Sequence, residues 1–116
     1  MRVRRMLGAA AAAGLTAGAL SLAAPAHADV DTDFARQLHT FGIYGQKDYN
    51  AWLAKIACER LFRGVDADAV DSARFISRNL PKDSTETQAW QFLATGVSTY
   101  CPEKFAVVEN AAQQRG

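Results

Sequence analysis

Apolar residues recur at intervals of three and four from Asp31 onward, and no useful length of chain alternates between apolar and polar positions. This periodicity is typical of amphipathic α-helices rather than strands. The sequence therefore predicts an all-α bundle of four main helices followed by a short C-terminal helix. The expected helices run from Asp31 or Thr32 to Phe41, from about Asp48 to Arg63, from a cap at Asp66 or Asp68 to Leu80, from a cap at Asp83 or Ser84 to Cys101, and onward from Pro102.

The apolar face of each expected helix indicates which residues form the core. The helix over 48–63 has one narrow polar stripe, Lys55, Glu59 and Arg63, so we expect it to be the central helix. The residues expected to be buried are Phe34, Leu38, Phe41, Tyr49, Leu53, Ile56, Ala57, Cys58, Leu61, Phe62, Ala69, Val70, Ala73, Ile76, Leu80, Ala89, Trp90, Leu93, Val97, Tyr100, Cys101, Phe105, Val108 and Ala112.

The first 28 residues follow a different pattern. A basic segment, Met1–Arg5, precedes an apolar stretch rich in alanine, and Ala26-His27-Ala28 ends it. This order is typical of a cleavable secretory signal peptide. Cleavage after Ala28 would leave a single domain over 29–116 with no stable membrane insertion, whereas a retained membrane anchor is the alternative. We expect the mature protein to be secreted, either extracellular or in the cell envelope. The pair Arg4-Arg5 leaves the twin-arginine route open beside the general secretory one.

Composition narrows the classes of partner. The chain has 13 basic and 12 acidic residues, and loss of the three arginines of the leader leaves ten basic residues against 12 acidic ones. No basic run remains after residue 28. We therefore expect no nucleic-acid partner.

The two cysteines, Cys58 and Cys101, allow one intramolecular disulfide. An oxidising compartment outside the cytoplasm favours it, and an intermolecular bridge or two free thiols are the alternatives. Cys58 adjoins the apolar arc of its helix, and Cys101 ends the apolar face of another. If these helices pack together, the thiols can meet. A bridge across 43 sequence positions would contribute about 4 kcal/mol to stability.

Several short motifs occur in a fixed order along the chain. Asp33-Phe34 is followed by Gly42-Ile43, then by Cys58-x-x-Leu61-x-x-Gly64, and finally by Tyr100-Cys101-Pro102. With the leader, this order resembles the domain-of-unknown-function 732 family of small exported proteins of mycobacteria and related actinobacteria. The resemblance covers about 31–102 and implies a helical fold in which the two cysteines pair. It implies no established activity.

Catalytic and metal-binding residues are scarce after the leader. The one histidine, His39, lies away from the apolar face of its helix, so we expect it in solvent rather than in a catalytic site. Asp66, Asp68 and Asp71 cluster at a helix start, where capping explains them better than a calcium site does. The sequence thus predicts a non-enzymatic protein with no metal and no cofactor.

Aromatic residues are numerous for so small a domain, and core packing accounts for most of them. Phe75 and Phe92 lie outside the main apolar faces, so the leading functional hypothesis is contact with an unidentified partner protein through these two. The alternative is carriage of a small apolar ligand, lipid or haem, in a pocket between helices. Candidate pocket residues are Tyr44, Tyr49, Trp52 and Trp90. His39, Tyr44 and Tyr49 are candidate ligands of a haem iron.

Overall fold

The computed structural model describes residues 30–115, and the predicted signal peptide lies outside these residues. The predicted all-α fold is confirmed for the described part, which contains no strand. The helices are α2 (Val30–Thr40), α3 (Lys47–Phe62), α4 (Ala69–Asn79), α5 (Glu86–Tyr100), the 3₁₀ turn η2 (Pro102–Lys104) and α6 (Phe105–Arg115). None of the helices that the structure describes is both long and apolar enough to cross a membrane.

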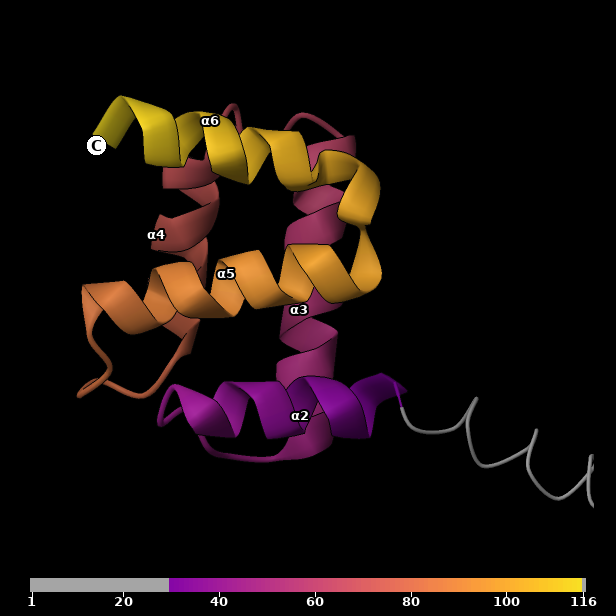
Figure 1. The fold of residues 1–116 in the computed structure, drawn as a ribbon, viewed down its shortest axis with the longest axis vertical. Helices are drawn as coiled ribbons and strands as arrows, with labels where there is room; N and C mark the ends of the chain where they lie inside the picture. Colours follow the sequence, from indigo (N-terminus) through magenta and orange to yellow (C-terminus); the bar gives the residue numbers. More distant parts are fainter. Residues whose placement is uncertain (1–29, 116) are drawn as a thin grey trace, which may run out of the picture. The chain divides into compact units, whose positions relative to one another are not determined.

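The central helix of the bundle is α5, and not the helix over 48–63 as expected. Helix α5 packs against α3, α4 and α6, and Figure 1 shows it lying across α3 and α4. Helix α2 also packs against α5 through Phe34. The ring of Phe34 lies edge-on to the rings of Phe92 and Tyr100, with centroid distances of 5.5 and 5.3 Å respectively. The central position fits its sequence, which has no charged residue from Thr87 to Tyr100.

A glycine allows α5 and α3 to approach closely. A Cβ atom added at Gly96 would lie 3.0 Å from the Cβ of Ala54 and 3.7 Å from the ring of Phe34. Because Ala54 has no rotatable side chain, this contact cannot be relieved without moving a helix.

We therefore expect Gly96→Val to destabilise the fold by about 1–3 kcal/mol, the usual cost of overpacking a core. The matched control is Ser98→Val, because Ser98 is exposed on the same helix and serine and valine have similar helix propensities. Urea unfolding of the three proteins gives the comparison. Equal stability of the two variants would refute the close approach.

The predicted inter-helix disulfide is present. Cys58 and Cys101 are both buried; their sulfurs are bonded, and their Cα atoms lie 6.0 Å apart. The bridge connects the last turns of α3 to the C-terminal cap of α5. Tyr100, next to it, donates a hydrogen bond of 2.5 Å to Asp31 of α2. The C-terminal end of α5 is thus fastened to both α3 and α2.

Several expected core positions are wrong. Phe41 is exposed and Ile43 is buried in its place, because α2 stops at Thr40 and Gly42 turns the chain with a φ of 78°. The Ile43 amide then donates to the Leu38 carbonyl at 3.0 Å, which holds Ile43 against the core.

Three residues of α3 are less buried than predicted, so the apolar arc of this helix is narrower than expected. Tyr49 and Phe62 are largely exposed, and Ile56 is half-buried. The Tyr49 hydroxyl instead donates to the carbonyl of Asn79 at 3.0 Å, and Lys104 lies over the Phe62 ring at 5.0 Å.

The caps and the last helix differ from the prediction in detail. Asp68, one of the two expected caps, accepts from the Asp71 amide and starts α4. Helix α5 is capped by Thr85 in a capping box with Gln88, rather than by Asp83 or Ser84. In α6, which starts at Phe105 after η2, the buried alanine is Ala111 and Ala112 is exposed.

Candidate functional site

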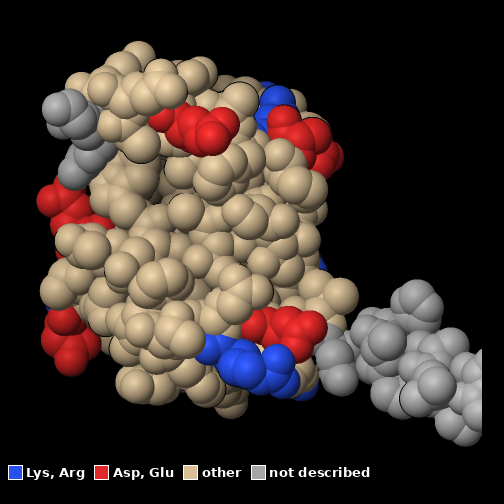
Figure 2. All heavy atoms as spheres, in the orientation of Figure 1, with Lys and Arg blue, Asp and Glu red and all other residues tan. Residues whose placement is uncertain are grey.

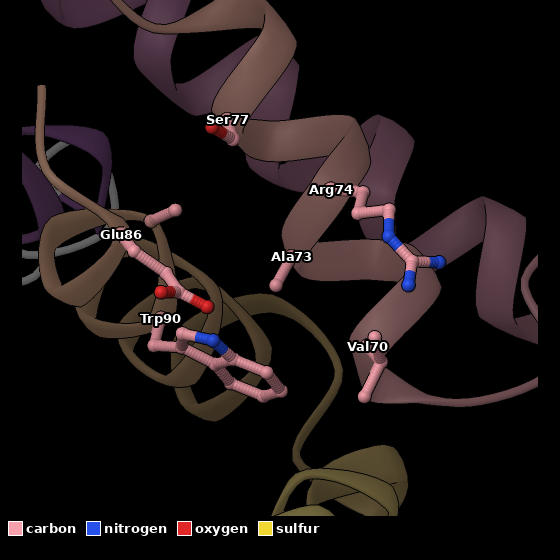
Figure 3. Close-up of a pocket in the computed structure, with 7 residues that line it drawn as sticks. Val70, Ala73, Arg74, Ser77, Glu86 and Trp90 are labelled. Carbon is pink, nitrogen blue, oxygen red and sulfur yellow. The ribbon is translucent and has the colours of Figure 1, made fainter.

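The largest of the described cavities lies between α4 and α5 and has a volume of about 490 Å³. Figure 3 shows its two walls, with Glu86 and Trp90 on α5 facing the side chains of α4. The positions on each wall are three or four residues apart, because they share one helix face. The lining residues are Val70, Ala73, Arg74, Ser77, Glu86, Ala89 and Trp90.

A second cavity of about 390 Å³ lies between α5 and α6 and is a groove more open to solvent. None of the residues that line it is charged, and Trp90 is one of them. The lining residues are Thr87, Trp90, Gln91, Ala94, Val108 and Ala112. The half-buried side chain of Trp90 therefore lines both cavities, and we call the pair of cavities the Trp90 site.

The surface around the groove carries few charges. Figure 2 shows this face, with the acidic and basic side chains toward its edges and an uncharged area over α5. The cause is the charge-free sequence of α5 after Glu86. An uncharged groove with an aromatic wall suits an apolar ligand better than it suits a strongly charged ligand.

The structure does not gather the four predicted pocket residues. Trp90 lines both cavities of the site, and neither cavity includes Tyr44, Tyr49 or Trp52. Tyr44 and Trp52 are 64% and 54% exposed. Tyr44 lies against His39 with ring centroids 5.0 Å apart, and Tyr49 lies against Trp52 at 5.8 Å. We refer to these two exposed pairs, which belong to the end of α2, the α2–α3 loop and the start of α3, together as the exposed aromatic cluster.

The haem hypothesis gains no support from this arrangement. His39 is exposed, as expected, and lies beside Tyr44 at the surface. No cavity among those described combines His39 with Tyr44 or Tyr49. The three predicted iron ligands therefore line no common pocket.

The prediction that Phe92 contacts a partner protein is wrong. Phe92 is 0% exposed, because it fills the space between α5 and α2 against Phe34. Phe75 is half-buried and packs against the core, and the guanidinium of Arg60 lies 4.1 Å from the centre of its ring. The two residues therefore form no common surface patch.

The acidic cluster has structural roles. The Asp66 carboxylate is buried, 1% exposed, and accepts from Arg60 at 2.9 Å and from the hydroxyl of Ser72 at 2.9 Å. Asp68 caps α4, and Asp71 pairs with Arg74 at 3.2 Å. Within residues 30–115, no group of three or more His, Cys, Asp or Glu residues is placed to hold a metal ion.

Another open cavity, of about 430 Å³, lies beside the disulfide and is lined by Lys55, Cys58, Glu59, Phe62 and Tyr100. Burial and the adjacent Asp31 carboxylate raise the pKa of the Tyr100 hydroxyl. This hydroxyl donates to Asp31, which also lies 3.7 Å from Lys55. A tyrosine that holds its proton in this way anchors α2 and is unsuited to act as a base.

Of the four predicted pocket residues, Trp90 alone lines the Trp90 site. The polar wall residues Arg74, Ser77 and Glu86 were not singled out. One available signal was the absence of charge in α5, since an exposed neutral helix face marks a candidate contact surface. The residues that α4 and α6 contribute depend on how the helices cross, which periodicity does not determine.

The comparisons with known proteins give a family but no activity. The family described as "Protein of unknown function (DUF732)" matches residues 30–103. Two uncharacterized proteins of Mycobacterium tuberculosis, Rv0559c of strain H37Rv and MT0585 of strain CDC 1551, are each 58% identical to the chain over 99 residues. Each match covers 84% of this chain and 88% of the relative. No solved structure matches significantly. The chain thus belongs to the domain-of-unknown-function 732 family, as its ordered motifs and paired cysteines indicated.

Proposed function

We propose that this protein is a non-enzymatic binding protein that holds a small apolar molecule in the Trp90 site, outside the cytoplasm. The observation that carries the proposal is that Trp90 lines two cavities, of about 490 and 390 Å³. Both volumes lie within the range of small-molecule sites, which are mostly apolar and carry a few polar groups.

The proposed location rests on separate observations. The leader-like pattern of residues 1–28 is that of an exported protein. The buried disulfide supports the same compartment, because structural disulfides persist mainly in oxidising environments. A catalytic role is disfavoured by the positions of the ionisable residues around the site. Glu86 and Arg74 line it, while His39 lies in the aromatic cluster at the surface.

The binding proposal can be tested with the fluorescence of Trp90 alone. The chain has two tryptophans, and Trp52→Phe removes the exposed one. Titration with N-phenyl-1-naphthylamine, an uncharged apolar dye, should quench Trp90 saturably at micromolar concentrations, because dye in the groove lies against the indole. In this background, Ala112→Arg should weaken binding about tenfold or more, since the new side chain occupies the groove.

The matched control is Gln113→Arg, which adds the same charge at the next, exposed residue of α6, outside the cavity. This variant should bind the dye as the parent does. An unchanged Trp90 signal, or equal affinities for the two arginine variants, would contradict a binding site in the groove.

A second candidate function is contact with a partner protein through the exposed aromatic cluster. Tyr44, Tyr49 and Trp52 supply its area, and tyrosine and tryptophan are enriched in protein interfaces. This candidate keeps the expectation of protein–protein interaction but moves the contact away from Phe75 and Phe92. It becomes the better proposal if apolar molecules leave Trp90 unaffected.

A further inference from the structure

The two cavities of the Trp90 site differ in chemistry. The α4–α5 cavity has a guanidinium, a hydroxyl and a carboxylate among its lining residues, from Arg74, Ser77 and Glu86. The α5–α6 groove has no charged residue in its lining. Because Trp90 lines both, a molecule that extends from one cavity into the other passes along the indole. Such a molecule would place a polar end beside α4 and an apolar end beside α6.

The charges of the polar cavity stand on opposite walls. Arg74 belongs to α4 and Glu86 to α5, and Figure 3 shows the Glu86 carboxylate beside the indole of Trp90. A carboxylate next to an aromatic ring favours a cation, since both attract an ammonium group. The opposite wall favours an anion.

Arg74 retains capacity to bind an anionic group. It pairs with the Asp71 carboxylate, which lies 3.2 Å from one terminal nitrogen of the guanidinium, and its side chain is 66% exposed. A guanidinium has five N–H donors in a fork that matches phosphate oxygens. A head group with a single negative charge would meet Arg74 favourably but would also lie near the carboxylates of Glu86 and Asp71. A head group with a single positive charge would leave Arg74 unused.

We infer that the ligand of the Trp90 site is a single-chain amphiphile with a zwitterionic head, its phosphate beside Arg74, its ammonium beside Glu86 and Trp90, and its chain in the α5–α6 groove. This inference rests on the proposed function and specifies the ligand class of the same site. The apolar groove supplies affinity for the chain, and the paired charges supply selection among heads.

The test compares heads on one chain length. Dodecylphosphocholine, dodecanoate, dodecyltrimethylammonium and the uncharged dodecyl maltoside are titrated, each below its critical micelle concentration, into the Trp52→Phe protein. Dodecylphosphocholine should bind about five- to tenfold more tightly than the other three, because only its head satisfies both walls.

Two substitutions test how each charged residue contributes to the preference for dodecylphosphocholine. The Arg74→Gln protein should bind dodecylphosphocholine only as tightly as dodecyltrimethylammonium. The Glu86→Gln protein should bind dodecylphosphocholine only as tightly as dodecanoate. Arg78→Gln is the control, since Arg78 is exposed one turn further along α4 and does not line the cavity. N-phenyl-1-naphthylamine should bind all three variants equally, because it has no charged head.

The outcomes separate the inference from the proposed function. Equal affinity for all four heads, tighter binding of dodecanoate, or a phosphocholine preference that survives both glutamine substitutions would overturn the inference while the dye still binds. Failure of the dye and of every amphiphile to affect Trp90 would overturn both.

Discussion

Replacing Cys58 and Cys101 together by alanine is expected to lower the free energy of unfolding by about 4 kcal/mol, the chain-entropy value for a bridge spanning 43 positions. This loss approaches the whole stability of a small domain, which is about 5–15 kcal/mol. Because the bridge fastens the end of α3 to the cap of α5, its loss also frees the end of α5 to which Asp31 is bonded.

Urea unfolding followed by circular dichroism measures this effect. The oxidised and the dithiothreitol-reduced wild-type protein supply the control, since they share every side chain and differ only in the bond. Both the reduced protein and the double variant should unfold at a much lower urea concentration. A difference below about 1 kcal/mol would show that packing alone holds α3 to α5.

Asp66→Ala is expected to lower the free energy of unfolding by about 3 kcal/mol. The carboxylate accepts hydrogen bonds from Arg60 and from Ser72, whose side chain is fully buried. Removing one member of a buried charge pair leaves its partners without hydrogen bonds in a site that water reaches poorly. The exposed part of Arg60 can still be hydrated, which keeps the cost at the lower end for such pairs.

The matched control is Asp33→Ala, which removes an exposed carboxylate paired with Arg36 at 2.6 Å. An exposed pair contributes less than about 1 kcal/mol. The two variants are compared by urea unfolding under one set of conditions. Equal losses would mean that the buried pair stabilises the α3–α4 connection no more than a surface pair does.

The helices and their ends were largely predictable, because periodicity and capping residues act locally. Gly64 ends α3 with a φ of 73°, and Asp68 starts α4, both as the sequence indicated. The helix expected to end at Phe41 ends at Thr40, two residues before Gly42. Because Gly42 has a positive φ, the chain turns there so that Ile43, and not Phe41, enters the core. A helical pattern that stops at the glycine does not predict this turn.

The burial of Phe92 was not predictable from one apolar stripe. A stripe assumes that a helix has one buried side, whereas α5 contacts neighbours on several sides. Phe92 therefore points to α2, and the adjacent Leu93 is buried as well. The same packing leaves Trp90 half-buried. Trp90 is the one lining residue of the Trp90 site that was predicted from the sequence as a pocket residue.

The most direct test of the proposed function is to locate a bound apolar molecule on the protein. Two-dimensional ¹H–¹⁵N NMR spectra of the labelled oxidised chain, recorded during a titration with dodecylphosphocholine below its critical micelle concentration, report every backbone amide together with both indole N–H groups. We predict saturable shifts confined to the Trp90 indole, Ala94, Val108 and Ala112, and to the α4 wall around Arg74. Shifts centred on Trp52 and Tyr49, or no saturable shift at all, would contradict binding at the Trp90 site.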